Sequence, residues 1–119
     1  MPKVLVIDDD ELLLSLMQNI LQGEGYSILS TADGPRGIAI YKEERPDVVL
    51  LDLGLPSMNG LEVLRKIRSL DENAKVIVVT GHGSAESVEV AYRSGAWDFV
   101  QKPFNNTDFL KLIKNAIES

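Results

Sequence analysis

Five short stretches of the chain are rich in apolar residues, and three of them contain four apolar residues in a row. These three are "VLVI" from Val4, "VVLL" from Val48 and "VIVV" from Val76. Continuous apolar runs of this length are typical of strands that are covered on both faces of a parallel sheet. We therefore predict strands at Lys3–Ile7, Tyr26–Thr31, Val48–Leu51, Lys75–Thr80 and Trp97–Gln101.

A helical spacing of apolar residues follows each predicted strand. The residues recur about one or two helical turns apart, which places their side chains on one face of a helix. They are Leu13, Met17, Ile20 and Leu21; Ile38 and Tyr41; Leu61, Leu64 and Ile67; Ala85, Val88 and Ala91; and Phe109, Ile113, Ala116 and Ile117. The "GEG" at 23–25 and Gly95 suit the left-handed turns that end helices. The pattern predicts five helices, each after a strand.

Strict alternation of strands and helices predicts an α/β fold with a parallel sheet and helices on both faces. Right-handed crossovers leave few arrangements of five strands, and the common doubly wound, flavodoxin-like order is 2-1-3-4-5. In such sheets a ligand binds at the carboxyl ends of the strands, where the strand order reverses. We therefore expect the functional site between the ends of the first and third strands.

Length and composition narrow the class of protein. A chain of 119 residues is predicted to form a single domain over 1–119. The absence of cysteine excludes disulfides and thiolate metal sites. A net charge of −6 without a Lys/Arg cluster argues against direct nucleic acid binding. No signal peptide and no apolar run near 20 residues is present, so we expect a cytoplasmic protein without membrane contact.

Charged and polar residues stand at the predicted carboxyl ends of the strands. Four acids, "DDDE" at 8–11, follow the first strand, although two like charges 4 Å apart repel by about 4 kcal/mol at an effective dielectric constant near 20. Asp52 follows the third strand, Thr80 ends the fourth and Lys102 follows the fifth. Parallel strands present these ends at one edge of the sheet, so we expect the residues to meet there.

Each of these residues alone has a structural explanation. Asp10 is a suitable N-cap for the first helix, and Asp8 with Glu11 three residues later resembles a capping box. Asp52 alone is explained as a turn residue before the Leu-Pro step, Thr80 alone as a strand end or an N-cap, and Lys102 alone as a solvated lysine. The whole set at one edge favours chemistry, because clustered carboxylate oxygens suit Mg²⁺ and a carboxylate can attack phosphorus to form an aspartyl phosphate.

With this set of residues, the sequence resembles the receiver domain of response regulators in bacterial two-component signalling systems. The resemblance covers the whole chain and is based on "VLVIDDDE", "DVVLLDLGLPSMNGLEVL", "VIVVTGHGS" and "GAWDFVQKPF", in the family's order and spacing. The amino-acid sequences of the last two motifs are most similar to those of receivers in transcriptional regulators of the nitrogen-regulation type.

The resemblance implies a phosphoacceptor and a metal site. Asp52 would accept a phosphoryl group from the phosphohistidine of a sensor histidine kinase or a histidine phosphotransfer protein. Asp9 and Asp52 would bind Mg²⁺ directly, together with the backbone carbonyl of Gly54, and Asp8 would bind it through a water. Lys102 would pair with a phosphoryl oxygen or, before transfer, with Asp52.

The resemblance also implies a switch. Thr80 would donate a hydrogen bond to the phosphoryl group, and the rotamer of Phe99 would follow Thr80. The altered surface would span the fourth helix, fifth strand and fifth helix, about 85–119, where an output domain or a second copy would dock. The domain would catalyse only its own phosphoryl transfer and slow dephosphorylation. The Lys102–Pro103 bond would be cis, an isomer that is essentially confined to bonds before proline.

Two positions depart from the family pattern. Position 54 is glycine where the family usually has a side chain, and His82 lies two residues after Thr80. Both positions border the expected phosphoryl pocket, so the family pattern does not fix the lifetime of the phosphoryl group. An exposed loop histidine without a role is an equally good explanation for His82.

Two other readings remain open. A phosphatase of the haloacid dehalogenase kind also has an Asp-x-Asp after an apolar strand, which here would make Asp8 the nucleophile and Asp10 the acid. That reading leaves Asp52 without a role. A degenerate receiver that only binds partners is the second alternative, and the intact set of acids, threonine and lysine argues against it.

Overall fold

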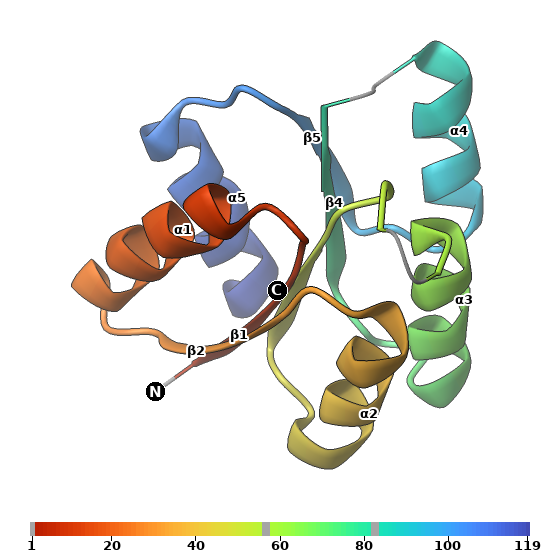
Figure 1. The fold of residues 1–119 in the computed structure, drawn as a ribbon, viewed down its shortest axis with the longest axis horizontal. Coiled ribbons are helices and arrows are strands. Elements are labelled where there is room, and N and C mark those ends of the chain that lie inside the picture. Colours follow the sequence, from red (N-terminus) through yellow and green to blue (C-terminus); the bar gives the residue numbers. More distant parts are fainter. Residues whose placement is uncertain (1, 56–57, 82–83) are drawn as a thin grey trace.

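The computed structural model describes residues 2–55, 58–81 and 84–119. Within these ranges, five strands alternate with five helices, as predicted (Figure 1). The strands are β1 (Lys3–Ile7), β2 (Ser27–Thr31), β3 (Val48–Leu51), β4 (Val76–Thr80) and β5 (Asp98–Gln101). The helices are α1 (Glu11–Gly23), α2 (Gly34–Glu44), α3 (Gly60–Leu70), α4 (Ala85–Arg93) and α5 (Asn106–Glu118).

The five strands form one parallel sheet in the order β2-β1-β3-β4-β5. The predicted order is therefore confirmed. β1 is the first strand of the chain but lies inside the sheet, between β2 and β3. The strand order reverses between β1 and β3, so the carboxyl ends of these two strands form the edge at which a ligand is expected.

Both faces of the sheet are covered by helices. α2, α3 and α4 lie on one face, and α1 and α5 lie on the other (Figure 1). Successive side chains of β1, β3 and β4 point alternately into the two cores, and both cores are apolar, which explains the continuous apolar runs. The strand residues are Leu5, Ile7, Val49, Leu51, Val76 and Val78 in the first core, and Val4, Val6, Val48, Leu50, Ile77 and Val79 in the second.

Three strands begin one residue later than predicted. Tyr26 precedes β2 because its amide donates to the Leu21 carbonyl at 3.1 Å and so closes the end of α1. Lys75 and Trp97 make backbone hydrogen bonds to neighbouring strands but lie just before the regular pairing of β4 and β5. Such differences of one residue are usual at element ends. None of the helices in the described ranges is long and apolar enough to cross a membrane.

Candidate functional site

Asp8 and Asp52 leave the sheet side by side. β1 and β3 are paired with Ile7 opposite Leu51, and the Asp52 amide donates to the Ile7 carbonyl at 2.9 Å. The next residue of each strand therefore emerges at the same edge, where the strand order reverses. This is the position expected from the sequence for the two acids.

Three carboxylates gather at this edge. Asp8, Asp9 and Asp52 each offer one oxygen, and the three oxygens lie within 4.8 Å of one another. Asp8 and Asp52 are buried, with 2% and 8% of their surface exposed, while Asp9 is exposed. Mg²⁺ takes oxygen ligands and is commonly held by one or two carboxylates together with waters. The donor set of this chain therefore fits the expected metal.

Lys102 brings a positive charge to the same edge. Its amide donates to the Thr80 carbonyl at 2.8 Å, which fixes the chain after β5 beside the end of β4. Its Nζ donates to Asp8 Oδ2 at 2.9 Å and lies 3.7 Å from Asp52 Oδ2. Lys102 thus contacts both buried acids, and the shorter contact is with Asp8 rather than with the expected Asp52. The Lys102–Pro103 bond is cis, as the family resemblance implied.

The pKa of the Asp8 carboxyl is subject to several opposing influences. Burial raises the pKa of its carboxyl above the ordinary value, and the charge of Asp52 acts in the same direction. The Asp10 amide, which donates to Asp8 Oδ1 at 2.9 Å, and Lys102 both favour the ionised form. Asp8 does not belong to a capping box of α1, because the side chain that caps this helix is that of Asp10, which accepts from the Leu12 and Leu13 amides.

The phosphoacceptor candidate Asp52 lies next to an open position. Its Oδ1 accepts a hydrogen bond from the Gly54 amide at 3.2 Å. A Cβ atom added at Gly54 would come no nearer to the surrounding atoms than 3.9 Å, the distance to Asp52 Oδ1. Gly54 and Thr80 line a cleft of about 450 Å³ between α3 and α4. His82, the second departure from the family pattern, lies outside the described residues.

Thr80 and Phe99 share one face of the sheet. Thr80 ends β4 and is 2% exposed. Phe99 pairs with Val78, two residues before Thr80, and packs against the core under α2, α3 and α4. Residues two apart on a strand point to the same side, so Thr80 and Phe99 face the same layer of helices. This arrangement is the one that the expected switch requires.

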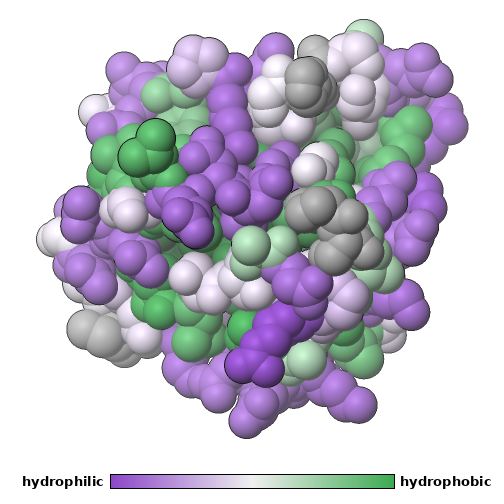
Figure 2. Space-filling view, in the orientation of Figure 1, coloured by the Kyte–Doolittle hydropathy of each residue, from purple (hydrophilic) through white to green (hydrophobic). Residues whose placement is uncertain are grey.

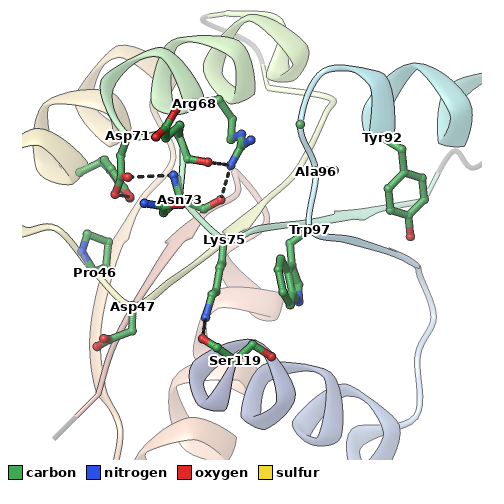
Figure 3. Close-up of a pocket in the computed structure, with 14 residues that line it drawn as sticks. Pro46, Asp47, Arg68, Asp71, Asn73, Lys75, Tyr92, Ala96, Trp97 and Ser119 are labelled. Carbon is green, nitrogen blue, oxygen red and sulfur yellow. Dashed lines mark hydrogen bonds between the residues drawn. The ribbon is translucent and has the colours of Figure 1, made fainter.

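A second cavity, of about 790 Å³, lies at the opposite edge of the sheet (Figure 3). Its basic side chains already have partners. Arg68 donates to the carbonyls of Glu72 and Ala74, and Lys75 donates to the carbonyl of Ser119 and lies 5.3 Å from the centroid of the Trp97 ring. These contacts tie the end of α3 to the loop before β4, and the start of β4 to the end of α5.

Comparison with known proteins identifies the class of this fold and site. The family model described as response regulator receiver domain matches residues 4–114. The chain is 33% identical to sporulation initiation phosphotransferase F of Bacillus subtilis over 115 residues, which cover 97% of this chain and 93% of that protein. A CheY-like receiver domain protein from Methanospirillum hungatei JF-1 has a similar solved structure, with a TM-score of 0.95 and 34% identity over 99% of this chain and 94% of that one. The chain therefore belongs to the family of response regulator receiver domains.

Some of its relatives are longer proteins. The DNA-binding response regulator MtrA of Mycolicibacterium smegmatis is 36% identical over 112 residues, which cover 94% of this chain and 49% of that protein. The chain thus spans about half the length of this relative. The resemblance to receivers, stated from four sequence motifs, is confirmed.

Proposed function

We propose that this chain is a phosphorylation-dependent signalling switch that accepts a phosphoryl group on Asp52. The observation that supports this proposal is the meeting of three carboxylates, a lysine ammonium and a buried threonine at one edge of the sheet. The phosphoryl donor is a phosphohistidine on a sensor histidine kinase or a histidine phosphotransfer protein. One relative is itself named a phosphotransferase, which agrees with a place in a relay of phosphoryl groups.

Phosphoryl transfer to Asp52 forms a bond from a carboxylate oxygen to phosphorus and breaks the bond from phosphorus to the donor imidazole nitrogen. Asp52 Oδ1 is held by the Gly54 amide, while Oδ2 lies on the side of Lys102. The ammonium of Lys102 would leave its contacts with the acids and neutralise charge on the phosphoryl oxygens. The hydroxyl of Thr80 would donate to one of the same oxygens.

The acidic side chains would hold Mg²⁺. Asp9 and Asp52 would be direct ligands together with the carbonyl of Gly54, and Asp8 would act through a water. When bound, the cation supplies positive charge that lowers the repulsion between the incoming phosphoryl group and the carboxylates. The burial of Asp8 and Asp52 strengthens this effect, because charges interact more strongly away from water.

The output of the switch would appear on the surface of α4, β5 and α5, about residues 85–119. A charge on Asp52 draws Thr80 inward, and Phe99 turns into the space that Thr80 leaves. An output domain or a second copy of the chain would dock on the altered surface. MtrA is named a DNA-binding response regulator, so regulation of transcription through a separate output domain is our first expectation, with the receiver in the cytoplasm and without nucleic acid or membrane contacts of its own.

The phosphatase reading is less well supported by the geometry. It requires the Asp10 carboxylate as an acid, but Asp10 Oδ1 accepts hydrogen bonds from two amides of α1 and serves as the helix cap. Asp52, which that reading leaves unused, lies in the carboxylate cluster with Asp8. We therefore expect no turnover of external phosphate esters, only self-phosphorylation and slow loss of the phosphoryl group.

Intact-mass measurement after incubation with acetyl phosphate and Mg²⁺ tests the proposal. The wild-type chain should gain the mass of one phosphoryl group, and Asp52→Asn should gain none. Asp10→Asn is the matched control, because asparagine is an equally good N-cap and the variant should still be labelled. Labelling of Asp52→Asn at the wild-type level would contradict the receiver site. A wild-type chain without any mass gain would favour the degenerate receiver that only binds partners.

A further inference from the structure

The start of α3 is fastened directly to the residue that follows Asp52. Gly60 is the first residue of α3 and is buried. Its amide donates to the Leu53 carbonyl at 3.2 Å, while the side chain of Asn59 caps the helix by accepting from the Leu61 amide. Helix and phosphoacceptor segment are therefore in backbone contact.

Gly60 has no room for a side chain. A Cβ atom at this position would lie 2.5 Å from Leu53 Cα, 2.7 Å from the Asp52 carbonyl oxygen and 3.0 Å from the Leu53 carbonyl oxygen. All three neighbours are backbone atoms, so a rotamer change in a neighbouring side chain cannot make space. Any larger residue must force the start of α3 and the chain at Asp52 and Leu53 apart.

Such a separation would also act on the site. The Asp52 amide is held by β1 through the Ile7 carbonyl, so the strand end resists movement. Leu53 is the link between Asp52 and Gly54, and Gly54 donates to Asp52 Oδ1. Displacing Leu53 therefore changes the position of Gly54 relative to the carboxylate.

We infer that Gly60 is a positioning residue: its missing side chain lets the start of α3 press against Leu53 and so sets the relative positions of the Asp52 carboxylate and the Gly54 carbonyl. This inference rests on the proposed function, in which both groups are metal ligands. Mg²⁺ requires nearly ideal octahedral geometry with ligands at about 2.0–2.1 Å, so a shift of a few tenths of an ångström at one ligand weakens binding. Gly60 itself touches neither metal nor phosphoryl group.

The test compares Gly60→Ala with two other glycine substitutions. Gly95→Ala is the destabilising control, because Gly95 has φ 106° and its added Cβ would meet Arg68, at the edge of the sheet away from the carboxylates. Gly23→Ala is the neutral control, because an added Cβ meets nothing within 4 Å. For each variant, calorimetry gives the Mg²⁺ dissociation constant, urea unfolding gives the stability, and amide NMR spectra of the metal-free protein report the Gly54 environment.

Gly60→Ala should weaken Mg²⁺ binding by about 10- to 100-fold, the range seen when residues that orient metal ligands are replaced. It should also move the Gly54 amide resonance in the absence of metal. Gly95→Ala should lose stability but keep the wild-type Mg²⁺ affinity within about twofold. Should Gly60→Ala fold poorly, the same titration is run in trimethylamine N-oxide, which favours the compact state.

Two results overturn the inference. One is a Gly60→Ala variant with wild-type Mg²⁺ affinity and an unmoved Gly54 resonance. The other is an equal loss of affinity in Gly95→Ala, which would make the effect one of general stability. A wild-type chain that binds no Mg²⁺ would instead contradict the proposed function, so the two failures are distinguishable.

Discussion

At the scale of single residues, Asp8 contacts both the acidic cluster and the lysine of the site. It is buried beside Asp52, it accepts from the Asp10 amide, and it pairs with Lys102 at 2.9 Å. Lys102 therefore offsets part of the repulsion among the three carboxylates before any metal is bound. The remaining excess of negative charge is a source of instability that a cation would remove.

Asp9→Ala should raise the melting temperature of the metal-free protein, because it removes one of three mutually repelling charges. In the wild type, Mg²⁺ at ten times its dissociation constant should add about 1.4 kcal/mol to the free energy of unfolding. The variant should lose this response. Thermal unfolding with and without Mg²⁺ measures both effects, and an equal Mg²⁺ shift in both proteins would place the cation elsewhere.

The open space at Gly54 leads us to predict a short lifetime of the phosphoryl group. Hydrolysis needs a water in line with the bond from phosphorus to the Asp52 oxygen, and no side chain at position 54 hinders that approach. We expect turnover within minutes rather than hours. Gly54→Met should slow dephosphorylation by excluding water, as followed by the decay of the phosphorylated mass. An unchanged decay would show that access at this position does not limit hydrolysis.

At the scale of elements, a hydrogen bond joins α2 to the end of α3. The Tyr41 hydroxyl donates to Asp71 Oδ2 at 2.8 Å, and the Arg45 guanidinium lies 3.7 Å from the same oxygen. Burial raises the pKa of Tyr41 to about 12, and the Asp71 carboxylate acts in the same direction. The amide of Asn73 and the Tyr41 hydroxyl lower the pKa of Asp71.

Tyr41→Phe should destabilise the protein by about 1 kcal/mol near neutral pH, the usual net value of such a hydrogen bond. A raised pKa in the folded state means that the contribution is complete below the ordinary tyrosine pKa near 10 and is lost as the pH rises through about 12. Urea unfolding of both proteins from pH 8 to 11 should show the difference shrinking above pH 10. A difference independent of pH would assign it to packing alone.

The elements themselves were largely predictable from the sequence, since apolar runs and helical spacing depend on local chemistry. The meeting of Asp8 and Asp52 was also predictable, because parallel pairing and strand order determine where strand ends lie. Two features were not. The contact of Lys102 with Asp8 depends on the reach of a flexible side chain, and the role of Gly60 depends on backbone packing across a loop. Neither feature produces a periodic pattern in the sequence.

At the scale of the whole molecule, the surface at α1 and the surface at α4 and β5 expose different kinds of apolar side chain. Figure 2 shows apolar side chains, bordered by hydrophilic ones, on the side where Figure 1 places α1 and α5. On α1, Leu12 is 84% exposed and Leu16 is 46% exposed. Near the end of α4 and the start of β5, the aromatic side chains of Tyr92 and Trp97 are exposed instead. The proposed output surface of α4, β5 and α5 includes this second surface.

Phosphorylation should therefore change amide chemical shifts along α4, β5 and α5 more than along α1 and α2. The physical reason is that Thr80 lines the cleft beside α4, that Phe99 belongs to β5, and that the Tyr92 hydroxyl donates to Asp98 Oδ1 of β5 at 3.1 Å. NMR spectra before and after addition of acetyl phosphate measure the pattern, with Asp52→Asn as control. Changes confined to the first two helices would contradict the proposed output surface.

The strand order has a consequence for aggregation. The uncharged apolar runs of β1, β3 and β4 have the composition of segments that form intermolecular sheets when exposed. All three strands lie inside the sheet, and the edges are formed by β2, "SILST", and β5, "DFVQ", whose polar residues discourage pairing with other chains. A rearrangement of β5 and α4 of the kind proposed would take place at one of these polar edges. The protein would then switch without opening its aggregation-prone centre.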